Sequence, residues 1–448
     1  MSEFDVSAVS VIGLGKLGGP MAVCYADKGY RVIGVDVDPD TVSEINEGKA
    51  HIYEPGFAEM LRKNRERISA THDYELAIRE SAITFIIVPT PSDESGGFSI
   101  ELVQPVAERI GEALRDKDDF HLVVLTSTVM PGQTEEVRKV LEKASGKRCG
   151  VDFGLCYNPE FIALGSVIRD LLNPDFILIG ESDERSGDIL SSFYKRVVGE
   201  KVPIARMNWI NAELTKLSVN TFVTTKITFA NMLAAICEKL PGADVDVVTK
   251  AISKDTRIGA KYLKGATGYG GPCFPRDVVA LSSFSRQIGE PARLAEATDT
   301  INREQVLRLV KLIKAKLPDK GKVGILGLSY KPNTDVIEES QGVMLAHSLT
   351  DEEITTIAYD PAAAETARGV LPPQVSFAPT MEECAREIDV LVVATPWDEF
   401  KNLRPSDLTR EGKQPVIIDC WRILDRDEFN QVADYIALGI GMPVGGEK

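Results

Sequence analysis

The sequence is poor in the residues that build metal sites. Its 448 residues include only four histidines, and its seven cysteines are scattered without CxxC spacing. With no cluster of cysteine and histidine, no metal site is expected. An odd and dispersed set of cysteines is typical of a reducing compartment, so we expect a cytoplasmic protein.

Long hydrophobic runs and an excess of positive charge are also missing. No stretch approaches about 18 uninterrupted apolar residues, and residues 1–6 have neither the basic start nor the apolar core of a signal peptide. The formal charge is −16 at pH 7, which disfavours nucleic acid and anionic membrane surfaces as partners. We therefore expect a protein that neither spans a membrane nor binds nucleic acid.

Apolar, β-branched runs alternate with helical patterns at both ends of the chain, as is typical of parallel α/β sheets. The strands predicted in the first half are Ala8–Ile12, Arg31–Val35, Thr84–Val88, Leu122–Thr126 and, more weakly patterned, Phe176–Ile179. Those predicted in the second half are Val323–Gly327, Thr355–Tyr359, Val390–Ala394 and Val416–Asp419. The last residues, 442–448, are expected to be frayed.

The middle of the chain is helical in pattern. Asn211–Leu240 is apolar-rich with few breakers and is predicted as one long helix, and further helical sequence extends to about Ala315. The fold class expected is α/β, with two Rossmann-like parallel-sheet domains joined by a central helical domain. We place these domains at residues 1–205, 206–318 and 319–448.

A glycine fingerprint follows the first predicted strand. Gly13-Leu14-Gly15-Lys16-Leu17-Gly18 opens a helix through Ala26, and its glycines allow a tight turn and close approach of the backbone to a pyrophosphate. The second strand ends in Asp36, 18 residues after Gly18, where a carboxylate accepts from a ribose 2′-hydroxyl and disfavours the phosphate of NADP. The pattern predicts an NAD site.

Two strand ends would line the same crevice, because ligands of parallel sheets bind at the carboxyl ends of strands. They are Pro89-Thr90-Pro91 and Ser127-Thr128-Val129. Taken alone, either segment is an ordinary loop.

Cys273 lies in the run Gly268-Tyr269-Gly270-Gly271-Pro272-Cys273-Phe274-Pro275-Arg276-Asp277. A helix is predicted over Asp277–Ile288, with Pro275 and Asp277 suited to its start. The thiol would then lie just ahead of a helix N-terminus, which favours a thiolate. The loop alone is equally compatible with a packed cysteine and with a reactive one. The NAD fingerprint upstream favours the reactive cysteine.

Three further polar residues are candidates. Lys216 and Asn220 are four residues apart on the long helix and share a face, so they could hold an oxyanion or simply form a solvated face. Glu160, in Tyr157-Asn158-Pro159-Glu160-Phe161, follows an Asn-Pro turn and is either a general base or a structural carboxylate.

From Gly13 to about Leu424 the chain resembles the nucleoside-diphosphate-sugar 6-dehydrogenases, the UDP-glucose/GDP-mannose dehydrogenase family, and within it the UDP-glucose branch. Besides the fingerprint and the cysteine loop, four motifs carry the resemblance: Asn158-Pro159-Glu160-Phe161, Ala212-Glu213-Leu214-Thr215-Lys216 with Asn220, Asp255-Thr256-Arg257-Ile258-Gly259, and Gly327-Leu328-Ser329-Tyr330-Lys331-Pro332-Asn333-Thr334-Asp335.

The resemblance implies oxidation of the C6 alcohol of a sugar nucleotide to a carboxylate with two NAD, most simply of UDP-glucose to UDP-glucuronate for polysaccharide biosynthesis. Cys273 would form a thiohemiacetal and then a thioester. Lys216 and Asn220 would polarise the oxyanions, Asp277 would place water or move protons, and Glu160 and Thr128 would assist proton transfer.

The resemblance also assigns binding residues. The cofactor would contact Gly13, Gly15, Lys16, Leu17, Gly18, Asp36, Thr90, Thr128, Glu160 and Arg276. The sugar nucleotide would contact Tyr157, Asn158, Glu160, Lys216, Asn220, Arg257, Tyr262, Leu263, Lys264, Gly265, Ala266, Gly270 and Lys331. Arg257 matches an arginine that a neighbouring subunit supplies, so a homodimer through the long helix is expected.

Four positions depart from the family pattern: Glu338 replaces an arginine, Leu164 lies where a carboxylate is common, Pro89 replaces a glycine and Arg276 a lysine. These residues leave open a TDP-glucose or other sugar-nucleotide enzyme. They also leave open an impaired NAD-binding regulator. A single-step β-hydroxyacid dehydrogenase would lack both the need for Cys273 and the second α/β region.

Overall fold

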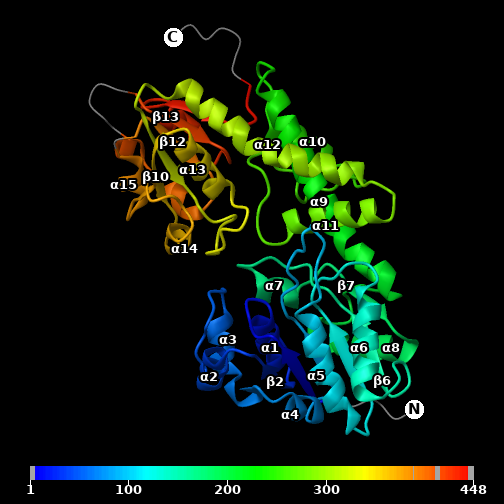
Figure 1. Ribbon diagram of the computed structural model, residues 1–448. Helices are drawn as coiled ribbons and strands as arrows, with labels where there is room; N and C mark the ends of the chain where they lie inside the picture. Colours follow the sequence, from blue (N-terminus) through cyan, green and yellow to red (C-terminus); the bar gives the residue numbers. More distant parts are fainter. Residues whose placement is uncertain (1–5, 387, 409–413, 442–448) are drawn as a thin grey trace. The chain divides into compact units, whose positions relative to one another are not determined.

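The computed structural model describes residues 6–386, 388–408 and 414–441. Contacts divide the chain into two compact units, Met1–Ser218 and Val219–Lys448, which we call the first and second unit (Figure 1). Within the described ranges, no helix is both long enough and apolar enough to cross a bilayer. The predicted frayed end at 442–448 lies outside the described residues.

An eight-stranded sheet forms the centre of the first unit, in the order β3-β2-β1-β4-β5-β6-β7-β8. Its strands are β1 (Ala8–Ile12), β2 (Arg31–Val35), β3 (Ile68–Thr71), β4 (Ile83–Ile86), β5 (His121–Leu125), β6 (Phe153–Tyr157), β7 (Ile177–Glu181) and β8 (Ile204–Met207). Neighbouring strands are parallel except β6 and β7, which pair antiparallel. The parallel sheet that we predicted thus extends from β3 to β6, and β7 reverses the direction.

Helices cover both faces of this sheet. They are α1 (Gly18–Asp27), α2 (Pro39–Glu47), α3 (Phe57–Lys63), α4 (Tyr74–Arg79), α5 (Val103–Arg115), α6 (Gln133–Ser145), α7 (Val167–Leu172) and α8 (Glu184–Val198), with the 3₁₀ turn η1 (Arg65–Arg67). Strand β5 shows why two layers are needed. Leu122 and Val124 pack into the core under α1, α3, α7 and α8, whereas Val123 and Leu125 pack under α4, α5 and α6. A strand with both faces apolar is stable only when both are covered.

The second unit contains a six-stranded sheet, entirely parallel, in the order β11-β10-β9-β12-β13-β14. Its strands are β9 (Lys322–Leu326), β10 (Thr355–Tyr359), β11 (Ser376–Phe377), β12 (Val390–Val393), β13 (Val416–Asp419) and β14 (Asp434–Ala437). The remaining elements here are α13 (Gln341–Asp351), α14 (Ala364–Arg368), α15 (Met381–Ala385), α16 (Arg426–Phe429), η2 (Asp398–Asn402) and η3 (Pro405–Leu408). The predicted fold class, with two Rossmann-like sheets and helices between them, is confirmed.

Four helices form the middle of the chain: α9 (Trp209–Cys237), α10 (Val245–Ile252), α11 (Phe274–Gln287) and α12 (Arg293–Lys316). Helix α9 begins in the first unit and continues into the second. It ends earlier than the predicted Leu240, just ahead of a Pro-Gly turn that a helix cannot continue through. Helix α11 begins at Phe274, three residues before the predicted Asp277.

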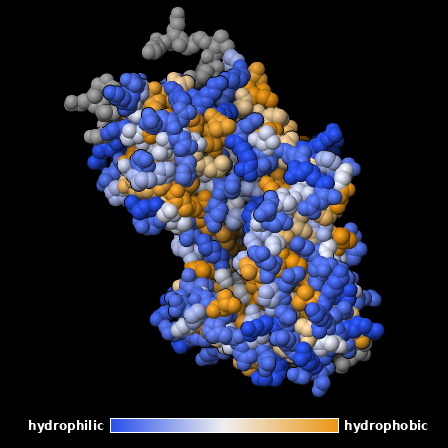
Figure 2. Space-filling view, viewed as in Figure 1, coloured by the Kyte–Doolittle hydropathy of each residue, from blue (hydrophilic) through white to orange (hydrophobic). Residues whose placement is uncertain are grey.

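Charged and polar side chains dominate the surface. Figure 2 shows hydrophilic residues over most of the visible face, with hydrophobic residues in smaller areas between them. This distribution agrees with a sequence in which 26% of the residues are charged.

Candidate active site

The glycine loop of the first unit is shaped to receive a pyrophosphate. Gly13 has φ +92°, a backbone conformation that residues with a side chain rarely adopt. A Cβ on Gly18 would lie only 1.8 Å from the carbonyl oxygen of Gly13, so this position also requires glycine. Gly15 is exposed, and a Cβ there would meet no atom within 4 Å. Lys16 is also exposed, and Leu17 caps the N-terminus of α1. Open space over a helix N-terminus is what bound NAD requires.

The carboxylate of Asp36 is tied to the same loop. Its Oδ2 accepts from the backbone N–H of Leu14 at 2.7 Å, and its Oδ1 accepts from the N–H of Asp38 at 3.0 Å. Asp36 therefore lies at the end of β2 beside the first turn of the fingerprint, as the ribose role requires.

Thr90 and Thr128 come from neighbouring strand ends and contact one another. The Thr90 hydroxyl donates to the backbone carbonyl of Thr128 at 2.8 Å. Thr90 is buried and Thr128 is half-buried. The two predicted crevice segments therefore form one edge of the first unit.

The carboxyl group of Glu160 has a strongly raised pKa. Burial raises its pKa to about 7, although a hydrogen bond from Tyr194 and the nearby charge of Lys216 act in the opposite direction. The Lys216 ammonium donates to the backbone carbonyl of Glu160 at 2.7 Å and lies 4.8 Å from the ring centroid of Phe161. Only 5% of Lys216 is exposed, so the solvated face that we considered for this residue is excluded.

The preceding residues of this motif are more enclosed. Tyr157, at the end of β6, and Asn158 are both buried. The amide of Asn158 donates to the backbone carbonyl of Leu178 at 2.8 Å and accepts from the Tyr194 hydroxyl at 2.5 Å. The Asn158 side chain is thus part of an internal network.

In the second unit, Asn220 and Asp277 form a buried pair. The Asn220 amide donates to Asp277 Oδ2 at 2.5 Å, and the exposed fractions are 6% and 3%. Asp277 is in the first turn of α11, where a negative charge is favoured. Asn220 is therefore not part of a solvated face either.

Cys273 is the N-cap residue of α11, as predicted from the loop sequence. Its carbonyl accepts from the N–H of Asp277 at 2.9 Å. Of the seven cysteines, Cys273 is the one that the structure exposes; five are buried and Cys149 is intermediate. The packed alternative for this thiol is excluded.

Buried amides hold the segment leading to Cys273. Asn231 of α9 accepts from the N–H of Ala266 at 2.7 Å and donates to the carbonyl of Thr267 at 2.9 Å. Asn302 of α12 accepts from the N–H of Tyr269 at 2.7 Å and donates to its carbonyl at 2.9 Å. The loop backbone is thus fixed before any ligand binds.

Two further contacts fix the ends of this segment. Arg422 donates to the carbonyl of Gly265 at 2.8 Å and forms an ion pair with Asp246 of α10. The N–H of Gly271 donates to the carbonyl of Glu338 at 2.9 Å, and a Cβ on Gly270 would lie 2.2 Å from the carbonyl oxygen of Glu339. Gly270 is required here because the two backbones touch.

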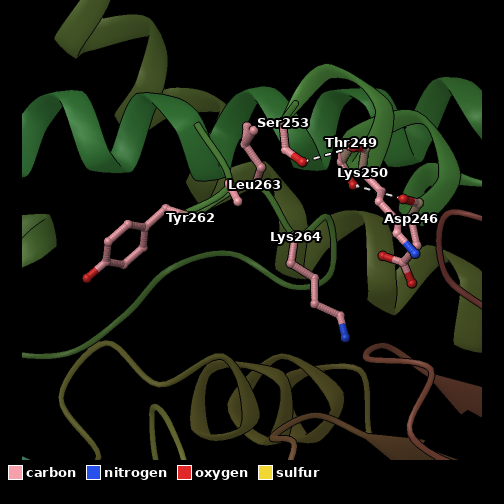
Figure 3. Close-up of a pocket in the computed structure, with 8 residues that line it drawn as sticks. Asp246, Thr249, Lys250, Ser253, Tyr262, Leu263 and Lys264 are labelled. Atoms are coloured by element: carbon pink, nitrogen blue, oxygen red, sulfur yellow. Dashed lines mark hydrogen bonds between the residues drawn. The ribbon is translucent and has the colours of Figure 1, made fainter. Parts of the chain in front are cut away.

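A cavity of about 320 Å³ lies between α10 and the predicted substrate loop (Figure 3). Its lining residues are Asp246, Thr249, Lys250, Ser253, Ala260, Tyr262, Leu263 and Lys264. Tyr262 and Lys264 are exposed, whereas Leu263, Gly265 and Ala266 are buried. The lining is polar and apolar in about equal parts, and its two lysines, Lys250 and Lys264, could contact an anionic ligand.

The other predicted binding residues are accessible to different degrees. Arg257 is largely exposed and forms an ion pair with Asp255, with 2.6 Å between Arg257 Nη2 and Asp255 Oδ2. Arg276 and Lys331 are half-buried, and the Lys331 ammonium lies 5.8 Å from the ring centroid of Tyr330. Glu338, the departure from the family pattern, is exposed.

Several residues that support the site carry no signal in the sequence motifs. Tyr194, Asn231, Asn302 and Arg422 belong to none of the motifs. The loop positions that Asn231 and Asn302 contact are 33–36 residues away along the chain. Only Asn231 had a signal in the sequence, because it is an asparagine on the apolar helix α9 and a buried amide there needs partners.

Three family models match consecutive parts of the chain. The NAD binding domain of the UDP-glucose/GDP-mannose dehydrogenase family matches residues 7–198, its central domain matches 210–304 and its UDP binding domain matches 324–426.

Individual relatives cover nearly the same span. UDP-glucose 6-dehydrogenase AglM of Haloferax volcanii is 36% identical over 94% of this chain and 98% of its own length. GDP-mannose 6-dehydrogenase of Pseudomonas putida is 37% identical over 79% of this chain and 80% of its own. The structure of a UDP-glucose dehydrogenase from Pyrobaculum islandicum, 33% identical, aligns with a TM-score of 0.88 over 98% of this chain and 99% of that one.

Proposed function

Because the chain belongs to the UDP-glucose/GDP-mannose dehydrogenase family, and is therefore an NAD-dependent 6-dehydrogenase of sugar nucleotides, we propose that it oxidises UDP-glucose to UDP-glucuronate. Each turnover would convert a primary alcohol to a carboxylate and consume two NAD and one water. The proposal on the substrate rests on the UDP-glucose dehydrogenases of similar length and fold.

NAD, when bound, accepts a hydride from the reacting carbon in each of the two oxidations. The residues that would hold it are Gly13, Gly15, Lys16, Leu17, Gly18, Asp36, Thr90 and Thr128. The geometry of Gly13, Gly18 and Asp36 supports this assignment, because it leaves the backbone of the loop open to a pyrophosphate and a carboxylate near a ribose. Glu160 and Arg276 complete the proposed set.

Cys273 provides the covalent step in our proposal. Its thiolate adds to the aldehyde carbon left by the first oxidation and forms a thiohemiacetal. Loss of the second hydride gives a thioester, which water cleaves to release the carboxylate and restore the thiol. The exposed position of Cys273 at the N-terminus of α11 carries this proposal, since a helix N-terminus stabilises an anion.

The buried polar residues would handle charge and protons around that step. Lys216 and Asn220 stabilise the oxyanions that form at the reacting carbon. Asp277, whose carboxylate accepts a hydrogen bond from Asn220, positions the hydrolytic water. Glu160, with Thr128, accepts the proton released by the alcohol through water, a role that suits a carboxyl group with a pKa of about 7.

For the sugar nucleotide, we propose binding along Tyr262–Ala266, with Gly270, Lys331, Tyr157 and Asn158 contributing. The fixed backbone of this loop and the lysines of the adjoining cavity support the assignment. We place the three domains at 1–205, 206–318 and 319–448, in agreement with the order of the three family models.

The test is NADH production from a panel of UDP-, TDP- and GDP-sugars, with NADH counted per sugar consumed. Two NADH per UDP-glucose, with carboxylate as product, is the expected result. A higher kcat/KM with GDP-mannose than with UDP-glucose would instead favour the GDP-mannose branch, one member of which is 37% identical over 79% of this chain. One NADH per sugar would contradict the thioester route, and no NADH with any sugar would favour an NAD-binding regulator.

We further propose that the working form is a homodimer built on α9. Three large side chains spaced by seven residues are exposed on this helix in the second unit: Phe222 (66%), Phe229 (44%) and Ile236 (47%). A seven-residue spacing places them along one face, and such an apolar face is unfavourable in water unless it is covered. The exposed Arg257 would then reach the site of the neighbouring subunit.

A further inference from the structure

The buried hydroxyl of Tyr194, in α8, lies within hydrogen-bond distance of two side-chain oxygens, one from Asn158 and one from Glu160. It lies 2.5 Å from Asn158 Oδ1 and 3.2 Å from Glu160 Oε1, and only 2% of Tyr194 is exposed. The Tyr25 hydroxyl, in α1, lies 3.4 Å away. All four residues belong to the first unit.

One of these acceptors has a fixed orientation. The Asn158 amide nitrogen donates to the carbonyl of Leu178 at 2.8 Å, so its oxygen must face Tyr194. That oxygen can only accept. When Glu160 carries a proton, Tyr194 can donate to Asn158 while accepting from the Glu160 carboxyl group.

The arrangement changes when Glu160 loses its proton. A carboxylate can only accept, so the Tyr194 hydroxyl must turn its proton toward Glu160, while the Tyr25 hydroxyl can donate to the Tyr194 oxygen. Each state leaves the half-buried carboxyl group of Glu160 with a hydrogen-bond partner, which matters because a charge withdrawn from water is destabilising when it has no partner.

We propose that Tyr194 is a positioning residue for Glu160, and that rotation of its hydroxyl between Asn158 and Glu160 lets this enclosed carboxyl group change charge during turnover. The inference rests on the proposed acid–base role of Glu160. It assigns to α8, which carries none of the family motifs that we identified, a supporting role that acts through Glu160.

Three titratable neighbours of Glu160, namely Cys24, Tyr25 and Tyr194, stay uncharged in the neutral range. Burial raises the pKa of Cys24 to about 12 and raises the pKa values of Tyr25 and Tyr194 well above their ordinary range. These residues and Lys216 of α9 are the groups that face Glu160 from α1, α8 and α9. Among these neighbouring groups, Glu160 is therefore the one whose titration a substitution at Tyr194 would move, and a carboxyl-specific readout separates it from Cys273.

The test compares pH profiles of kcat/KM for the wild type, Tyr194→Phe and Tyr25→Phe. Loss of the Tyr194 hydrogen bond should move the acidic limb upward by about one pH unit, so that activity falls about tenfold below the limb and recovers at alkaline pH. Tyr25→Phe is the comparison variant: it removes a buried hydroxyl from the same aromatic cluster and the donor to the Tyr194 oxygen, but no direct bond to Glu160, so its acidic limb should move less. An equal shift in both variants, or an unshifted limb in Tyr194→Phe, would overturn the proposal.

A readout without turnover separates this inference from the proposed function. The infrared band of the protonated Glu160 carboxyl group, identified by its loss in Glu160→Gln, should titrate at higher pH in Tyr194→Phe than in the wild type. That shift would support the role of Tyr194 even if UDP-glucose were not oxidised. An unchanged titration in a folded variant would refute it whatever the substrate is.

Discussion

At the scale of single residues, the proposed covalent mechanism makes the thiol of Cys273 necessary for the second of the two oxidations. Replacing it by alanine should abolish formation of the carboxylate while leaving NAD binding nearly intact, because the glycine loop and Asp36 are untouched. The measurements are NADH per sugar consumed and calorimetric NAD affinity. Full carboxylate production by Cys273→Ala would refute the covalent mechanism.

Serine at the same position gives a finer comparison. Cys273→Ser keeps a nucleophile of similar size, but an alkoxide is a poorer leaving group than a thiolate. We expect this variant to stop at an aldehyde or an acyl-enzyme, which mass spectrometry of the intact protein would distinguish. Turnover at the wild-type rate would contradict this account.

Asp36 should determine the choice of cofactor. Its carboxylate would repel a 2′-phosphate, so kcat/KM should be far lower with NADP than with NAD, and Asp36→Ser should narrow the difference. The substitution also removes the hydrogen bond from the Leu14 N–H, so NAD binding should weaken as well. Equal kcat/KM for both cofactors in the wild type would contradict the ribose role.

Residue by residue, the sequence predicted what short motifs carry. The glycine turn, the place of Asp36 after β2 and the place of Cys273 ahead of a helix follow from local spacing, although α11 begins three residues earlier than predicted and makes Cys273 its N-cap. The surroundings of Glu160 could not be predicted, because Tyr194 lies 34 residues away with no motif of its own. Burial of Lys216 also depends on tertiary contacts that helix spacing does not reveal.

At the scale of elements, the strands that the sequence did not predict are mostly edge strands. Strands β3 and β8 bound the first sheet, and β11 and β14 bound the second. Edge strands are short and partly exposed, as the intermediate burial throughout β8 shows, so they lack the continuous apolar run that marks a central strand. Strand β6 is the exception, since it is central and fully buried but contains Gly154.

The asparagine pairs make the cysteine loop a rigid element. Asn231→Ala would leave the N–H of Ala266 and the carbonyl of Thr267 buried without these partners, which should lower the free energy of unfolding by about 2–4 kcal/mol. Urea unfolding would measure the loss, and kcat should fall with it because the loop leads to Cys273. Asn46→Ala is the control: it removes a similar pair of bonds to Ala70, on β3, and should leave kcat intact. An unchanged kcat in Asn231→Ala would show that the loop needs no such support.

At the scale of the whole molecule, the two sheets have the same glycine turn after their first strand, but the aspartate beside each turn has a different role. Gly13 and Gly327 both have positive φ, and each donates its N–H to the last residue of the second strand at 2.8 Å. Asp360 is the counterpart of Asp36, but it is buried and accepts from Leu328, Ser329 and Trp397. Its carboxylate stabilises the fold, whereas Asp36 is only half-buried and can face a ribose.

The apolar face of α9 gives the last prediction. If Phe222 and Phe229 are covered by a second copy, Phe222→Glu should place a charge in that interface and produce a monomer, because burying an unpaired carboxylate costs several kcal/mol. Sedimentation equilibrium would give the mass of each variant. Val370→Glu is the control, since Val370 is similarly exposed but lies outside α9.

If Arg257 acts in the neighbouring subunit, the monomer should retain NAD binding and lose sugar oxidation. A Phe222→Glu protein that stays dimeric would place the interface elsewhere, and a fully active monomer would show that Arg257 serves its own chain.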